Sequence, residues 1–244
     1  MAPTSELKID GTVIWYDSDV LDPMEPGLFE PDWLRDNGSL RGSAQGRNKA
    51  YFLHFSGLDL VLRQFRRGGL VGKFNRDRYI CTEVGKGRAM REFALLAWMR
   101  RKGLPVPRPV AARHRPSGLL YRADLITERV PGARSLAEVL QECALPERDW
   151  IAIGSVIRQL HSVGVNHADL NCRNILLDAS GQAWLIDFDK CERRESNRWM
   201  KQNLARLRRS IEKEKRKHKR FNWSTDDWSV LMSGYMEGGV PQAR

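Results

Sequence analysis

The sequence predicts an α+β fold of two lobes, in which an antiparallel sheet with one helix precedes a small, mostly helical lobe. Most of the short apolar patterns typical of strands lie before residue 130. The clearest helical spacings, apart from one, follow the turn residues Pro131 and Gly132. A chain of 244 residues can bury a sizeable core as one domain with two lobes, but a third domain would not fit comfortably.

Residues 1–37 are dense in turn signals and predict an extended N-terminal cap with one short strand over 12–16. The first lobe, residues 38–130, is predicted to hold a five-stranded sheet and one helix. Gly46 lies in a glycine-containing turn before the strand 50–55. Backbone N–H groups in such a turn can approach phosphates closely, so Gly46 is a candidate nucleotide-binding residue. A plain hairpin accounts for this weak pattern equally well.

The next predicted strand, 58–65, carries Arg63 near its end. A guanidinium can bind phosphate oxygens bidentately and also pair with a carboxylate, which makes Arg63 a second nucleotide-binding candidate. The helix predicted over 87–102 has an apolar stripe at helical spacing, formed by Met90, Phe93, Ala94 and Ala97. Glu92 lies one position off this stripe and can reach Arg63. A surface arginine and a solvent-facing glutamate are the alternatives.

Residues 119–121 and 124–128 predict two further strands, and the turn after them separates the lobes. The second lobe, residues 131–244, begins with helical patterns, of which 150–160 is the most clearly amphipathic. We expect the helix over 150–160 to support the loop that follows it.

That loop and the segment after it carry three oxygen donors. Asp169 is followed by Asn174 five residues later, and Asp187 ends an apolar strand that returns from a tight turn. A hairpin brings its open ends together, so Asn174 and Asp187 can meet on one Mg²⁺. With Asp169 accepting a hydroxyl proton, this set is typical of phosphoryl transfer from ATP. The alternative is an Asp/Asn-rich loop before an ordinary hairpin. We expect His167 to hydrogen-bond the loop backbone rather than to carry protons.

The motif from His167 to Asp178 (HADLNCRNILLD), followed by Ile186 to Lys190 (IDFDK), resembles the catalytic and metal-binding loops of the protein-kinase-like superfamily. It is most similar to bacterial 3-deoxy-D-manno-octulosonic acid (Kdo) kinases, which belong with the lipopolysaccharide core heptose kinases. The resemblance runs from about Gly38 to the C-terminal tryptophans. Asp189 departs from the glycine of ordinary protein kinases. Because Asp adopts positive φ less readily than Gly, a mobile magnesium loop is less expected.

The resemblance implies a two-lobed kinase-like fold that uses ATP and Mg²⁺. By it, Asp169 is the general base, Asn174 and Asp187 bind the metal, and Glu92 holds Arg63 at the phosphates. The implied acceptor is Kdo on a lipid A precursor, phosphorylated at the 4-hydroxyl in lipopolysaccharide core assembly. A heptose kinase, a small atypical protein kinase acting on a ribosome- or tRNA-associated complex, and a non-enzymatic adaptor on a kinase scaffold are the alternatives.

The segment 193–220 contains thirteen Lys or Arg and three Glu, a net charge of +10 out of +11 for the chain. A basic amphipathic helix is predicted over about 196–220, with Met200, Leu204, Leu207 and Ile211 on its apolar side. The candidate contacts with a membrane or the acceptor are Arg206, Arg208, Arg209 and Lys213. An anionic membrane surface suits such a helix. Nucleic acid is the less favoured partner, and a solvated helix is the plain alternative.

Four scattered cysteines without a Cys-x-x-Cys pair fit reduced thiols. The sequence also shows no signal-peptide pattern and no apolar run of the ~20 residues that a span needs. We therefore expect a cytoplasmic protein, held peripherally on the cytoplasmic face of the inner membrane.

Overall fold

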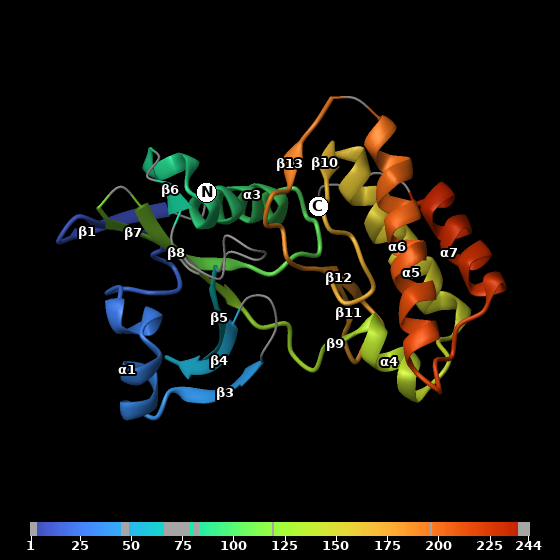
Figure 1. The fold of residues 1–244 in the computed structure, drawn as a ribbon, viewed down its shortest axis with the longest axis horizontal. Helices are drawn as coiled ribbons and strands as arrows, with labels where there is room; N and C mark the ends of the chain where they lie inside the picture. Colours follow the sequence, from blue (N-terminus) through green and yellow to red (C-terminus); the bar gives the residue numbers. More distant parts are fainter. Residues whose placement is uncertain are drawn as a thin grey trace. The chain divides into compact units, whose positions relative to one another are not determined.

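The computed structural model describes residues 4–44, 49–65, 79–80, 83–118, 120–195 and 197–238 (Figure 1). The chain divides into two compact units. The first comprises Met1–Ala97 and Arg108–Arg129, and the second comprises Trp98–Pro107 and Val130–Arg244. The mixed α+β fold with a large antiparallel sheet confirms the predicted fold class.

One antiparallel sheet dominates the first unit (Figure 1). Its strands follow the order β1-β2-β7-β8-β5-β4-β3, and β6 pairs with β8. The strands are β1 (Thr4–Ile9), β2 (Thr12–Asp17), β3 (Leu40–Ala44), β4 (Lys49–Phe55), β5 (Leu58–Gln64), β6 (Tyr79–Ile80), β7 (Pro109–Ser117) and β8 (Leu120–Glu128). The described residues form eight strands in this sheet, so the prediction of five was wrong. Two of the additional strands are the N-terminal hairpin, which joins the sheet through the pairing of β2 with β7. The strands predicted over 119–121 and 124–128 belong to the single strand β8.

Residues 4–37 are folded rather than extended. They contain β1 and β2, the short 3-10 helix η1 (Pro26–Phe29) and helix α1 (Pro31–Asp36), so the prediction of one short strand was wrong. Arg113 of β7 binds this segment, because its Nη1 lies 2.6 Å from Glu30 Oε1 and its guanidinium lies 4.7 Å from the centre of the Phe29 ring. On its other side, Arg113 Nε donates to Asp124 Oδ2 over 2.9 Å. The contacts with Glu30 and Phe29 join residues more than 80 positions apart, which turn signals cannot indicate.

Helix α3 (Arg88–Arg101), preceded by the 3-10 helix η2 (Val84–Lys86), matches the helix predicted over 87–102. Its buried positions differ from those predicted and are Ala89, Met90, Glu92, Phe93, Leu96 and Met99. Ala94 is exposed and Ala97 is only half-buried, so the predicted stripe was wrong by part of a turn. Glu92 lies within the buried face. Small alanines fit either side of a helix, whereas the larger Leu96 and Met99 decide which side is buried.

The second unit contains a small sheet of order β12-β11-β9, a two-stranded pair β10-β13, and most of the helices. Its elements are β9 (Arg134–Ser135), α4 (Leu136–Glu142), α5 (Glu147–Ser162), β10 (Val165–Asn166), β11 (Ile175–Leu177), β12 (Ala183–Leu185), β13 (Glu192–Arg193), α6 (Arg198–Lys217) and α7 (Thr225–Glu237). Capping boxes start two helices: Ser135 with Glu138 at α4, and Ser224 with Asp227 at α7. Helices α5, α6 and α7 lie side by side (Figure 1).

Helix α6 is amphipathic, as predicted, and at 20 residues it is the longest helix of the described part. Leu204, Leu207 and Ile211 are buried, whereas Met200 is only half-buried. The four cations singled out in the sequence, Arg206, Arg208, Arg209 and Lys213, are all exposed. Among the described residues, no helix combines the length and the apolar composition that a membrane span requires.

Two glycines allow α5 and α7 to pack closely. A Cβ added at Gly154 of α5 would overlap the carbonyl oxygen of Leu231, and one added at Gly234 of α7 would overlap the carbonyl oxygen of Ile151. The backbones therefore touch where these glycines face each other. This contact fixes α5, the helix that leads into β10 and the loop after it.

We expect Gly154→Ala to lower the free energy of unfolding by about 1–3 kcal/mol, because the new methyl group forces the two helices apart. An unconstrained helical glycine would instead gain about 0.5–1 kcal/mol on the same change. Ser233→Ala, at an exposed position next to Gly234, is the control and should change stability little. Urea denaturation followed by circular dichroism measures both variants, and a stabilised Gly154→Ala variant would contradict the packing described.

Candidate functional site

The candidate site is built on the loop 167–174, which connects β10 to β11 in the second unit. Its shape is held by hydrogen bonds within it. The Asn171 amide donates to the Asp169 carbonyl over 2.9 Å, and Asn171 Oδ1 accepts from the Arg173 backbone N–H over 2.9 Å. The Asn174 N–H donates to the Asn171 carbonyl over 3.0 Å. Short polar side chains that bond to nearby backbone favour such turns over helix or strand.

The hairpin β11–β12 places Asn174 and Asp187 at the same open end. Ile175 pairs with Leu185, and beyond this pair the Ile186 N–H donates to the Asn174 carbonyl over 3.0 Å. The closed end is fixed by Asp178, whose carboxylate accepts from Ser180 N–H at 2.9 Å and from the Trp184 indole at 2.8 Å. The hairpin expected from the sequence is therefore present, with the two predicted metal ligands flanking it.

The donors at this end suit Mg²⁺. The Asn174 side-chain nitrogen donates to the Asp169 carbonyl over 3.0 Å, so Oδ1 is the side-chain atom of Asn174 that can accept a cation. Asp187 supplies a carboxylate, and both groups are the hard oxygens that Mg²⁺ prefers. Within the described residues, no group of three or more His, Cys, Asp or Glu is arranged to hold a metal. A nucleotide-borne Mg²⁺ needs fewer protein ligands, because phosphates and waters complete its octahedron.

His167 is a structural residue, as predicted. It is fully buried, and burial lowers its pKa. Its Nδ1 accepts from the Asp169 backbone N–H at 3.3 Å, and its Nε2 lies 3.0 Å from the Ile186 carbonyl oxygen. An acceptor at Nδ1 and a donor at Nε2 correspond to one neutral tautomer. The ring therefore ties the loop to the end of β12 and has no site left for proton transfer.

The segment after β12 has two residues with left-handed backbone. Asp187 has φ +66° and Lys190 has φ +64°, while Asp189, which replaces the glycine of protein kinases, is not among the residues with positive φ. Between them, Phe188 is buried and its ring centre lies 4.8 Å from that of His167. Non-glycine residues in this region are costly, and such strain is concentrated at functional sites.

Asn203 of α6 connects that helix to the start of the loop. Its Oδ1 accepts from the His167 backbone N–H over 3.1 Å, and its Nδ2 donates to Asn166 Oδ1 over 2.9 Å. The same Oδ1 lies 3.3 Å from His161 Nε2, and His161 Nδ1 lies 2.8 Å from the Tyr235 hydroxyl. Burial holds the pKa of His161 at about 4, so its ring is neutral at pH 7.

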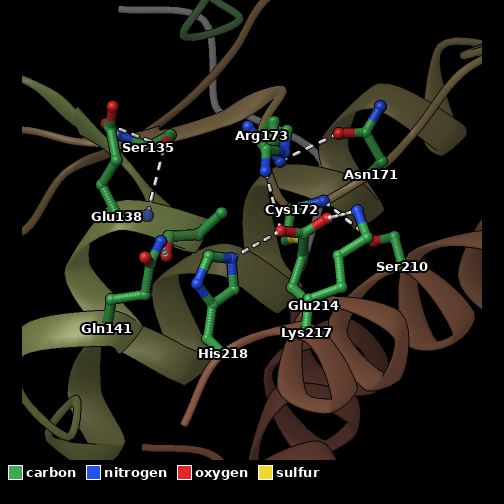
Figure 2. Close-up of polar contacts among 11 residues, drawn as sticks. Ser135, Glu138, Gln141, Asn171, Cys172, Arg173, Ser210, Glu214, Lys217 and His218 are labelled. Atoms are coloured by element: carbon green, nitrogen blue, oxygen red, sulfur yellow. Dashed lines mark hydrogen bonds and ion pairs between the residues drawn. The ribbon is translucent and has the colours of Figure 1, made fainter. Parts of the chain in front are cut away.

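Two further residues of α6 hold the rest of the loop (Figure 2). The Ser210 hydroxyl accepts from the Cys172 N–H over 3.0 Å, and Glu214 Oε2 accepts from Arg173 Nη2 over 2.7 Å. With Asn203 and Arg206, these residues form what we call the α6 row: Asn203, Arg206, Ser210 and Glu214. Spacings of three and four residues place them on one face of the helix. Sequence reasoning missed this role, although polar residues on the apolar side were a signal for it.

Glu214 forms hydrogen bonds with several basic side chains (Figure 2). Burial by itself acts to raise its pKa, but hydrogen bonds from Arg173, Lys217 and His218 outweigh this and hold the pKa at about 2. The Lys217 ammonium lies 3.0 Å away and the His218 ring nitrogen 3.2 Å away. Glu214 is therefore ionised at neutral pH. From α6 it anchors Arg173, which lies on the loop.

Asp169 points into a more open environment. Its side chain is 55% exposed, and its Oδ1 lies 3.5 Å from Nη1 of Arg206, which is 50% exposed. An exposed carboxylate is accessible to a substrate hydroxyl, as a general base must be. The structure thus brings Asp169, Asn174 and Asp187 to one loop and one hairpin end, while their catalytic and metal-binding roles remain predictions.

The first unit contains the predicted nucleotide-binding pair. Arg63 on β5 and Glu92 on α3 form a buried ion pair, with Nη1 2.7 Å from Oε1 and side-chain exposures of 15% and 1%. The contact expected from the sequence is present, and its role toward phosphates remains a prediction. Gly46 lies outside the described residues.

We expect the free energy of unfolding to fall as the pH drops from about 4.5 to about 2. Glu214 has its low pKa only in the folded chain, so its stabilisation is present above 4.5 and is lost as protons bind. Glu214→Gln should flatten this part of the profile and cost about 1–3 kcal/mol at neutral pH, because a buried hydrogen-bonded charge is removed. Denaturant titrations over pH 2–7 measure the free energy of unfolding of each variant. Glu212→Gln, which loses only a contact with Arg208, is the control, and equal pH slopes in the two variants would contradict the assignment.

Comparison with known proteins agrees with the motif. The chain matches the family model described as "Lipopolysaccharide kinase (Kdo/WaaP) family" over residues 31–235. It is 43% identical over 230 residues to the "3-deoxy-D-manno-octulosonic acid kinase" of Photobacterium profundum, an alignment that covers 94% of this chain and 97% of that protein. The protein of the same name from Vibrio cholerae serotype O1 is 42% identical over 220 residues, covering 90% and 93%. That from Haemophilus influenzae (strain PittEE) is 40% identical over 216 residues, covering 85% and 89%. The chain therefore belongs to the lipopolysaccharide kinase (Kdo/WaaP) family.

Proposed function

We propose that this protein is an ATP-dependent kinase that phosphorylates a hydroxyl of Kdo on a lipid A precursor during lipopolysaccharide core biosynthesis. The observation that carries the proposal is the 43% identity to a protein named for this activity, along 97% of that protein's length. The loop 167–174 and the β11–β12 hairpin supply the matching chemistry. Family resemblance favours the 4-hydroxyl as the acceptor group. The relatives described favour this function over the heptose kinase and the atypical protein kinase.

In the proposed reaction, Asp169 accepts the proton of the sugar hydroxyl as its oxygen bonds to the γ-phosphorus of ATP. The bond from that phosphorus to the bridging oxygen breaks, and ADP leaves. Asn174 and Asp187 would hold Mg²⁺, which neutralises charge on the phosphates. The backbone bonds of the loop and the contacts of the α6 row keep Asp169 and Asn174 in place, so catalysis is mostly positioning and charge stabilisation.

The Arg63–Glu92 pair is proposed to steady the ATP phosphates. Glu92 is almost fully buried and fixes one end of the Arg63 guanidinium, which has further N–H donors for phosphate oxygens. This arrangement would replace the lysine that ordinary protein kinases use. Gly46 is proposed to contribute backbone N–H groups to the same phosphates.

The basic face of α6, defined as Arg206, Arg208, Arg209 and Lys213, is proposed to contact an anionic membrane surface. Its side chains are exposed, and in the described part of the chain neither Arg209 nor Lys213 has an ion pair. An acceptor anchored by lipid lies at such a surface, so attraction would bring enzyme and substrate together. This proposal puts the protein peripherally on the cytoplasmic face of the inner membrane.

We expect Asp169→Asn to lower kcat by about 10²–10⁴-fold without loss of folding, since the change removes the base but keeps the shape of an exposed side chain. Transfer of labelled phosphate from ATP to Kdo–lipid A precursor measures it. Asp226→Asn, at an exposed position on α7, is the control. Near-normal turnover by Asp169→Asn would reject the proposed base.

We expect reversal of three cations, Arg208→Glu, Arg209→Glu and Lys213→Glu, to weaken binding to vesicles containing anionic lipid by about a hundredfold or more. Each nearby cation contributes about 1 kcal/mol to such binding. Co-sedimentation at several salt concentrations measures it, and the triple variant should also lose salt dependence. The matched control reverses three exposed cations at the end of α3, Arg100, Arg101 and Lys102. Equal binding by the two triple variants would remove the role of α6.

A further inference from the structure

One member of the α6 row differs from the others in its surroundings. Asn203 and Glu214 are buried and bind the loop through short contacts. Arg206 is half exposed, and its contact with Asp169 Oδ1 is 3.5 Å long. A long, exposed ion pair contributes little to stability, because water screens it and both side chains lose freedom. The presence of Arg206 at this place is therefore poorly explained by folding.

The position of Arg206 makes it a neighbour of the acceptor. A hydroxyl that gives its proton to Asp169 must approach the carboxylate to about 2.6–3.2 Å. The Arg206 guanidinium contacts that same carboxylate, so it lies next to the place that the reacting hydroxyl must occupy. It therefore competes with an incoming hydroxyl for the lone pairs of Asp169.

A carboxylate on the acceptor resolves this competition. The relatives are named for 3-deoxy-D-manno-octulosonic acid, a sugar that carries a carboxylic acid. A guanidinium binds a carboxylate through two parallel N–H···O bonds, which are stronger than one bond of 3.5 Å. Arg206 can therefore exchange one carboxylate for another. Arg173 is not available for this purpose to the same extent, because Glu214 holds it at 2.7 Å.

We propose that Arg206 is a specificity-determining residue that binds the carboxylate of the acceptor sugar and thereby frees Asp169 to take the hydroxyl proton. This inference rests on the proposed function and adds to it the acceptor group that is recognised and the residue that recognises it. A neutral sugar would leave Arg206 on Asp169 and would be phosphorylated more slowly.

The test uses two soluble acceptors without lipid or phosphate, a Kdo glycoside and its carboxyl methyl ester. Neither acceptor binds a membrane, so the attraction of the basic face drops out of the measurement. We expect the wild-type protein to prefer the free carboxylate by about tenfold or more in kcat/KM. Arg206→Ala should bring this ratio close to one while KM for ATP stays unchanged. Arg206→Lys keeps the charge but lacks the planar guanidinium that bonds a carboxylate through two N–H groups. It should restore part of the wild-type preference.

Lys201→Ala is the matched control, because Lys201 is an exposed cation five residues earlier on α6 and its replacement removes the same charge. It should keep the wild-type ratio. A ratio in Arg206→Ala equal to that of the wild type would overturn the inference while leaving the proposed function intact. The same holds if Arg206→Ala affects only acceptors that carry lipid A phosphates. Failure of the wild-type protein to phosphorylate any Kdo acceptor would overturn both.

Discussion

The contact between α6 and the loop 167–174 holds that loop, the centre of the candidate site, in place. A helix rises about 1.5 Å per residue, so the α6 row from Asn203 to Glu214 spans about 16 Å. Its members meet the loop in sequence order, from His167 through Cys172 to Arg173. A loop without regular structure thereby gains a rigid partner along its whole length. A rotation of α6 by one residue, about 100°, would break every one of these bonds.

This contact explains why buried polar groups are tolerated on the apolar side of α6. Asn203 and Glu214 would be costly there without partners. Each binds the loop and has further partners, and Leu204, Leu207 and Ile211 supply the apolar burial that docks the helix. Because one side of α6 is fixed in this way, its cations are forced outward. The exposed basic face and the position of Asp169 thus follow from the same orientation of one helix.

The second constraint is the join between the hairpin and the segment after it. His167 binds the Ile186 carbonyl, packs against Phe188 and receives the Asp169 N–H, so one buried ring connects the loop to the segment that carries Asp187. The positive φ angles at Asp187 and Lys190 show that the chain turns sharply on both sides of Phe188. Local backbone strain of this kind persists only where the surrounding contacts over-determine it. Here those contacts are a buried imidazole and a buried phenyl ring.

Amino-acid order alone was enough to predict the features that depend on near neighbours. The spacing of Asp169, Asn174 and Asp187 predicted one loop and one hairpin, and helical periodicity predicted α3, α5 and α6, because turns and helices are governed by residues a few positions apart. Folding in three dimensions set the pairing of β2 with β7, the exposure of Ala94, and the contacts of Asn203, Arg206 and Glu214 with the loop. Each of these features depends on which residues lie close together in the folded chain. Strand register, competition for burial and the choice of a buried partner act between residues tens of positions apart, and no local pattern encodes them.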